Sequence, residues 1–235
     1  VGSLLRRAAY AWQFGDINVL ISNQIKADSR IQYRRDIQER VEQVAPFLTL
    51  DHDPYLVIDK GQMLWVQDAY TIMDKYPYST PSQGENGDFN YIRNSVKIVI
   101  SAYDGTMQFY IADESDPLIQ SYEQIFPELF ISMSEMAPSL REHIRYPVDL
   151  FSIQANTYLQ YHMKDSTVFF NKEDQWSIPQ EVYFGSPQAM EPYYVIMKLP
   201  HHEEEEFVLI LPFTPSNKPN LVAWLAARND GQNYG

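Results

Sequence analysis

Apolar residues recur at helical spacing near the start of the chain. The repeat predicts an amphipathic helix that ends at Gly15, a residue suited to the left-handed turn that closes many helices. We expect a second helical stretch over residues 17–25, and a third from an N-cap at Ser29 to Ala45, just before Pro46. The apolar stripe of the first helix consists of Leu5, Ala8, Ala9 and Trp12.

After the third helix the apolar pattern changes from helical to alternating, which indicates β-strands. Two alternating runs flank Lys60-Gly61 and two more flank Asp104-Gly105, and glycine at such a position favours a tight hairpin. A long polar loop is expected over residues 77–90. A further strand pair is expected near the C-terminal end. The predicted strands cover residues 55–59, 62–70, 95–100, 107–111, 193–199 and 206–213.

Helices are expected again after the second hairpin. Asp116 followed by Pro117 matches an N-cap ahead of proline at the first helical position. We expect residues 117–163 to be helical, interrupted by prolines, and residues 220–228 to form a final helix.

Helices and hairpins occupy separate stretches of the chain, so the predicted class is α+β. We expect one domain over residues 1–235, in which antiparallel hairpins pack against segregated helices. Residues 1–45 form its helical N-terminal segment, and residues 46–235 contain the hairpins and the remaining helices.

The charge of the chain excludes one class of partner. The net charge is −13, whereas proteins that bind nucleic acid need a basic surface, so we expect no nucleic-acid partner. Residues 1–45 differ, with seven basic and five acidic residues, which fits either a solvated helix face or a membrane-proximal segment. The chain contains no cysteine, which excludes thiol nucleophiles, disulfides and thiolate metal ligands within it.

Two carboxylates flank an imidazole in the sequence Asp51-His52-Asp53. Such a group could bind a metal or position a general base. Residues this close in sequence need further ligands to complete a metal site. We therefore favour a turn in which the aspartates accept backbone N–H bonds.

Arg93 and Asn94, with Arg145, are the candidate binding residues. A guanidinium near the end of a strand could clamp a carboxylate or a phosphate. The alternative, which we favour, is that these groups brace the hairpin internally. If the chain is an enzyme, its catalytic groups are expected to meet in one cleft. They would come from Asp51, His52, Asp53, Arg93, Asn94, His143 and Arg145.

His201 and His202 stand beside four glutamates and could trap a divalent ion weakly. A solvated hairpin tip fits the same pattern, and we favour it. Glycines occur singly, without a phosphate-binding loop or a nucleophile elbow, so no cofactor is expected.

Several longer motifs carry a family resemblance. They are NYIRNSVK, AYDGT, IFPELF, HIRYPVDLF, YHM, PYYVIMKLP and NLVAWLAARNDG. Over nearly its whole length the chain resembles the uncharacterised protein family 0182, large bacterial membrane proteins. Its members have several N-terminal membrane helices followed by a large region outside the plasma membrane. Ser101 stands where the family pattern has an aspartate before AYDGT, so an activity that needed this carboxylate would be lost.

The resemblance implies that this chain is the first part of that extracytoplasmic region. It transfers no catalytic role to any residue, because the family carries no established activity. We therefore expect a binding or assembly domain without catalysis, whose partners are the protein's own membrane helices and other envelope or membrane proteins. The alternatives are a cell-envelope hydrolase and a substrate-handling domain of a transporter.

Overall fold

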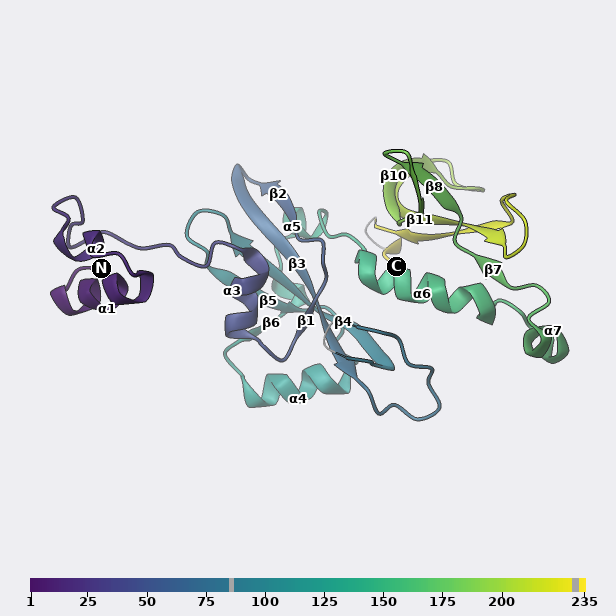
Figure 1. The fold of residues 1–235 in the computed structure, drawn as a ribbon, viewed down its shortest axis with the longest axis horizontal. Helices are drawn as coiled ribbons and strands as arrows, with labels where there is room; N and C mark the ends of the chain where they lie inside the picture. The colour runs from purple at the N-terminus through teal and green to yellow at the C-terminus, as the bar shows by residue number, and fades with distance from the viewer. Residues whose placement is uncertain (85–86, 230–232) are drawn as a thin grey trace.

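The computed structural model describes residues 1–84, 87–229 and 233–235. An N-terminal pair of helices precedes a six-stranded sheet with helices on both faces, and a four-stranded sheet packed on a long helix follows (Figure 1). This arrangement confirms the predicted α+β class. No helix in these residues has the length and apolar character needed to cross a membrane.

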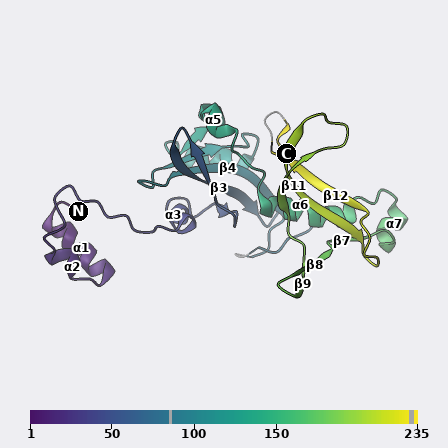
Figure 2. The same ribbon diagram turned by 90° about the horizontal axis from the view of Figure 1, so that it is seen from above.

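The first predicted helix is confirmed as α1 (Leu4–Phe14), which ends at Gly15 with a φ of +63°. The second helical stretch is shorter than the predicted residues 17–25, because α2 covers only Asn18–Ile21. In both ribbon views this pair lies apart from the sheets and is joined to them by an extended segment (Figures 1 and 2).

The predicted apolar stripe of α1 faces away from the rest of the described chain. Leu5 is 84% exposed and Trp12 is 89% exposed. On the opposite face, Tyr10 and Phe14 pack edge-to-face on Tyr33. The aromatic side therefore closes the helical pair, and the stripe stays open to solvent.

The third helix, α3 (Ile37–Val44), begins later than predicted. The expected N-cap at Ser29 is wrong because residues 29–35 are not helical, and the hydroxyl of Ser29 accepts the N–H of Lys26 at 2.9 Å. Asp36 caps α3 instead, and its side chain accepts the N–H of Glu39.

The central sheet has the strand order β1-β3-β4-β5-β6, with β2 paired to another part of β3. Both predicted hairpins are confirmed: Lys60 and Gly61 have φ of +48° and +79° between β2 and β3, and Gly105 has +71° between β4 and β5. The strands are β1 (Thr49–Leu50), β2 (Tyr55–Asp59), β3 (Gln62–Met73), β4 (Tyr91–Ser101), β5 (Met107–Ile111) and β6 (Phe130–Ser132). The expected loop lies between β3 and β4, and its residues 85–86 are outside the described residues.

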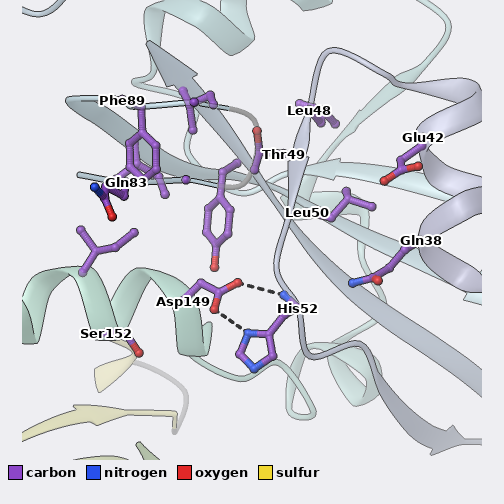
Figure 3. A pocket seen from close by; sticks show the side chains of 16 residues that line it. Gln38, Glu42, Leu48, Thr49, Leu50, His52, Gln83, Phe89, Asp149 and Ser152 are labelled. Atoms are coloured by element: carbon purple, nitrogen blue, oxygen red, sulfur yellow. Dashed lines mark hydrogen bonds and ion pairs between the residues drawn. The ribbon is translucent and has the colours of Figure 1, made fainter. Parts of the chain in front are cut away.

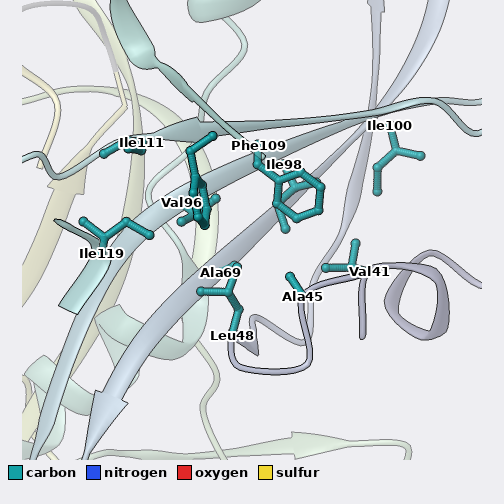
Figure 4. Close-up of a cluster of buried hydrophobic side chains, with 11 residues drawn as sticks. Val41, Ala45, Leu48, Ala69, Val96, Ile98, Ile100, Phe109, Ile111 and Ile119 are labelled. Atoms are coloured by element: carbon teal, nitrogen blue, oxygen red, sulfur yellow. The ribbon is translucent and has the colours of Figure 1, made fainter. Parts of the chain in front are cut away.

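Successive side chains of the central strands enter different cores, because their direction alternates. Ile98 and Ile100 pack in one cluster with Val41 of α3 and Ile119 of α4 (Pro117–Ile125), and Figure 4 shows these side chains together. Val99, between them, packs in a second cluster with α5 (Pro138–Arg141). The sheet is therefore covered on both faces.

The region predicted as helical over residues 117–163 also contains a strand. Asp116 caps α4 as predicted. After α4 the chain forms β6, parallel to β5, and a short 3-10 helix, η1 (Met133–Glu135). The three-residue strand is too short to leave an alternating pattern. Beyond α5 the chain forms the long helix α6 (Val148–Tyr161).

The second sheet has the order β10-β11-β12, and β7 pairs with β11. The predicted pairing of residues 193–199 with 206–213 is confirmed by β10 and β11, and Phe151 and Ala155 of α6 pack on this sheet. The remaining elements are α7 (Ser166–Asn171), β7 (Trp176–Ser177), β8 (Gln180–Tyr183), β9 (Ser186–Ala189), β10 (Tyr193–Lys198), β11 (Glu205–Pro215) and β12 (Ala223–Arg228).

The final helix predicted over residues 220–228 is wrong, because this segment forms β12. It pairs antiparallel with β11 from Ala223 to Arg228 and buries Ala227. The alanines of this segment favour a helix by themselves. The edge of β11 offers hydrogen-bond partners to its backbone N–H and C=O groups, and this pairing makes it a strand.

Polar contacts join the two sheets. Lys97 of β4 donates to the carbonyl of Arg145 at 3.1 Å. The hydroxyl of Tyr194 on β10 donates to the carbonyl of Tyr146 at 2.7 Å. These bonds hold Arg145 and Tyr146, which lie in the segment leading into α6. The first turn of α6 consequently lies beside the turn between β1 and β2.

A candidate pocket with a histidine and two aspartates

A cavity of about 530 Å³ lies among α3, the edge of the central sheet and α6 (Figure 3). Its walls are partly apolar and partly polar. The apolar side chains are Leu48, Leu50, Ile72, Phe89, Ile92 and Ile153. The polar side chains are Gln38, Glu42, Thr49, His52, Tyr70, Gln83, Asp149 and Ser152. This volume and this mixture of linings suit a small organic ligand.

Asp51 lies behind the pocket wall, and its side chain is 2% exposed. Its Oδ2 accepts the hydroxyl of Tyr70 and the N–H of Asp149, the latter at 3.0 Å. Its Oδ1 accepts the N–H of Asp53 at 2.9 Å, which is the turn expected from the sequence. Burial, followed by the charge of Asp51, raises the pKa of Tyr70 well above its usual range. Asp51 is thus held rigidly by three donors.

His52 and Asp149 form a two-point contact, drawn as dashed lines in Figure 3. The Nδ1 atom of His52 lies 2.5 Å from Oδ1 of Asp149, and the N–H of His52 donates to Oδ2 at 2.9 Å. Burial alone would lower the pKa of His52, but attraction and hydrogen bonding to Asp149 outweigh it and raise the pKa. Burial and repulsion from Asp51 raise the pKa of Asp149.

The three side chains together offer one nitrogen and two carboxylates. One ligand atom from each of Asp51, His52 and Asp149 lies within 4.8 Å of the others. The side chain of His52 is 64% exposed, so its ring is accessible from solvent. Such a group can exchange a proton with a ligand or coordinate a cation.

Arg93 and Asn94 lie outside this pocket and are engaged within the sheet. Arg93 pairs with Asp113 at 3.1 Å, with half of its side chain exposed. Asn94 donates to Asp68 at 3.0 Å. Asn94 thus braces β4 against β3, whereas the ion pair of Arg93 with Asp113 lies at the surface.

Arg145 and His143 line a different cavity, of about 380 Å³. The guanidinium of Arg145 lies 4.5 Å from the ring centre of Tyr55 and 5.3 Å from that of Tyr194. The predicted residues are therefore not gathered in one cleft, because Arg145 is packed where the two sheets meet and His143 is exposed beside it.

His201 and His202 lie at the tip between β10 and β11, as expected. His202 Nδ1 is 3.4 Å from a carboxylate oxygen of Glu206, and Arg228 pairs with the same carboxylate at 2.5 Å. The arginine already balances this glutamate, which weakens the tip as a metal site.

Sequence reasoning missed Asp149, Tyr70, Gln38 and Glu42 as parts of the pocket. Asp149 had a local signal, because an acid in the first turn after Pro147 is typical of a helix start. Nothing in the sequence linked that turn to His52, which lies 97 residues earlier.

The fold and the pocket define the class of protein as an α+β domain that encloses a cavity of ligand size between a sheet edge and a helix. The chain belongs to the uncharacterised protein family UPF0182, which matches residues 1–235. This finding confirms the resemblance noted from the motifs.

Relatives in several organisms are similar along the whole chain. A UPF0182 protein of Pelotomaculum thermopropionicum is 52% identical over 235 residues, which are 100% of this chain and 25% of the relative. One of Trichodesmium erythraeum is 50% identical over 251 residues, 100% of this chain and 27% of the relative. The chain thus spans about a quarter of the length of these relatives. No solved structure matches it.

Proposed function

We propose that this chain is a ligand-binding domain without catalysis, situated outside the plasma membrane in a larger membrane protein. The observation that carries the binding role is the cavity of about 530 Å³ beside His52 and Asp149. The location is supported by the resemblance to membrane proteins, and the larger protein is supported by relatives about four times as long as this chain.

The lining of the pocket defines the chemistry of its ligand. Leu50, Phe89 and Ile153 offer apolar contact, whereas Glu42 and Asp149 add negative charge. A ligand with an apolar body and a cationic or hydrogen-bond-donating group satisfies both surfaces, because buried charges and polar groups require partners.

A photo-crosslinking amino acid in the full-length protein tests the binding role. Gln83 is exposed and lines the pocket, whereas Gln62 is exposed on β3 outside it. Irradiation of membranes should give a small-molecule adduct, found by mass spectrometry, at position 83 and not at position 62. Ile153→Trp, which fills part of the cavity, should reduce the amount of adduct at position 83. Equal adducts at both positions would show that the pocket does not select a ligand.

Cysteine labelling of the full-length protein tests the location. This chain has no cysteine, and Tyr78 is fully exposed whereas Val66 is fully buried. A membrane-impermeant maleimide added to intact cells should label Tyr78→Cys beyond the level of the parent protein. Val66→Cys should react only after denaturation. Labelling of Tyr78→Cys only in permeabilised cells would place the domain on the cytoplasmic side.

An assembly role is supported by α1. Its open stripe contains Leu5 and Trp12, and large exposed apolar surfaces commonly mark contacts with other proteins or membranes. The proposed contact is with other parts of the membrane assembly, including the protein's own membrane helices.

The pairing of His52 with Asp149 favours a hydrolase as the second candidate. A carboxylate on Nδ1 orients an imidazole as a general base, with Nε2 available to a substrate. The test is hydrolysis of acyl ester and glycoside substrates by the full-length protein. Turnover that disappears in His52→Ala would favour this candidate over binding alone.

A further inference from the structure

We propose that Asp51, His52 and Asp149 bind one divalent transition-metal cation. The ligands are Nδ1 of His52 and one carboxylate oxygen from each aspartate. This inference uses the pocket of the proposed function but goes beyond it, because a cation can bind there whether or not an organic ligand does.

The donor atoms are close to the spacing that a metal requires. Nδ1 of His52 lies 2.5 Å from Oδ1 of Asp149 and 4.0 Å from Oδ1 of Asp51. Ligand atoms about 2.0–2.2 Å from a zinc ion are about 3–3.5 Å apart. Each of the two distances therefore needs to change by only about 0.5–1 Å. The exposed ring of His52 can make that movement by rotating about its side-chain bonds.

The hydrogen bonds of Asp51 leave one position for the metal. An ionised carboxylate can accept about four hydrogen bonds, two on each oxygen. Within the part of the chain that the structure describes, Oδ2 accepts from Tyr70 and Asp149, while Oδ1 accepts from Asp53 alone. The remaining acceptor position is on Oδ1, the oxygen whose distance to His52 Nδ1 is 4.0 Å.

The surrounding backbone holds the ligands in place as metal sites require. The N–H of Asp149 bonds to Asp51, and the N–H of His52 bonds to Asp149. Gln38 of α3 donates to the carbonyl of Asp51 at 3.0 Å. Such supporting bonds orient metal ligands and raise affinity. They also link α3, the β1–β2 turn and α6 around one point.

The charges and donor types indicate which cation fits. Two carboxylates and one imidazole compensate a dication, which in turn screens the repulsion between Asp51 and Asp149. A nitrogen donor with two oxygens suits Zn²⁺, Mn²⁺, Fe²⁺ or Co²⁺, whereas Ca²⁺ and Mg²⁺ prefer oxygen ligands alone. Water can complete the coordination because His52 borders the open pocket.

Metal titration of the full-length protein tests the site after treatment with a chelator. Co²⁺ serves as the spectroscopic probe and Zn²⁺ as the calorimetric one. The wild-type protein is expected to bind one more equivalent of metal than His52→Ala. With Co²⁺ it should also show visible absorption bands that this variant lacks. His52→Ala removes an exposed side chain, so folding should be preserved, and the melting temperature without metal checks this.

Two further variants sharpen the result. Asp149→Asn should lower the affinity at least about tenfold, because it removes a charged ligand. Asp53→Asn, which alters the adjacent carboxylate outside the group of three, should leave binding unchanged. Equal metal binding by the wild type and His52→Ala would overturn the inference, as would loss of binding in Asp53→Asn alone. An adduct at position 83 that persists while metal binding fails would overturn the metal site and leave the proposed ligand pocket standing.

Discussion

Lys97 and Asp68 form an ion pair inside the protein, with 2% and 3% of their side chains exposed. The ammonium also donates to the carbonyl of Arg145 at 3.1 Å and to the hydroxyl of Tyr234 at 2.8 Å. Burial raises the pKa of Asp68, although Lys97 and a hydrogen bond from Asn94 oppose that rise. The pair ties the central sheet to the segment that enters α6 and thereby supports the pocket.

Removing one member of this pair is expected to leave the other charge buried without compensation. Lys97→Met should lower the free energy of unfolding by about 3–5 kcal/mol. The double variant with Asp68→Leu should recover much of that loss, because neither charge remains. Denaturant unfolding measures both, with exposed Lys75→Met as the control, expected to stay within about 0.5 kcal/mol. A loss in Lys97→Met as small as in the control would contradict the role given to the pair.

The helices and hairpins that were predicted correctly are those whose turn or cap residues are close to them in the sequence. Lys60-Gly61 sets the hairpin between β2 and β3 through two positive φ angles, and Asp116 caps α4 next to Pro117. Turn and cap chemistry is local, so the sequence contains it in full. Ser29 shows the limit of that reasoning, because Asp36 offers the same capping chemistry closer to the helix.

The elements that were missed depend on distant contacts. β12 is a strand because the edge of β11 is available, and a window of sequence around Ala227 contains no sign of that edge. The pocket itself was not predicted, because we favoured a turn at Asp51-His52-Asp53. Asp51 and His52 were named as a group that needed further ligands, but Asp149 joins them only after α6 has packed against the central sheet.

Asp116 anchors the start of α4 under the sheet and is fully buried. Its carboxylate accepts hydroxyls of Ser95 at 2.7 Å and Thr71 at 2.6 Å, and the N–H of Leu118 at 3.1 Å. Asp116→Ala should lower the unfolding free energy by about 2–4 kcal/mol, from a lost cap and unpaired hydroxyls. Asp116→Asn retains an acceptor and should lose less, as denaturant unfolding can show. Equal losses in the two variants would mean that only the charge matters.

The same residue predicts an acid-dependent loss of stability. Burial alone would raise the pKa of Asp116, but hydrogen bonds from Ser95, Thr71 and Tyr91 outweigh it and hold the pKa below 3.8. The unfolded chain therefore takes up this proton at a higher pH than the folded protein. The stabilisation is complete above the unfolded pKa of about 4 and is lost as the pH falls through the folded value.

Unfolding free energies measured from about pH 6 to pH 2 should show this effect as a difference between two proteins. The stability advantage of the wild type over Asp116→Asn should be constant at the upper end and should shrink as the solution becomes more acidic. An advantage that did not change with pH would show that ionisation of Asp116 contributes nothing.

Gly105 is predicted to be the more sensitive of two hairpin glycines. Gly61 and Gly105 have φ of +79° and +71°, so alanine is strained at both. A Cβ at Gly61 would meet nothing within 4 Å, whereas at Gly105 it would overlap the guanidinium of Arg40. That guanidinium donates to the carbonyl of Gly105 at 2.9 Å and to that of Tyr33 at 3.3 Å. Displacing it therefore also breaks the hydrogen bond that holds Tyr33, in the extended segment before α3.

Gly61→Ala should therefore lower the unfolding free energy by about 1–2 kcal/mol, the cost of a left-handed conformation. Gly105→Ala should lower it by at least about 1 kcal/mol more, because hydrogen bonds of Arg40 are also lost. Repeating both substitutions in an Arg40→Ala background isolates the clash, since the added cost at Gly105 should disappear there while the cost at Gly61 stays the same. If the difference between the two glycines survived in that background, it would arise from the β4–β5 turn itself, and the guanidinium would have no part in it.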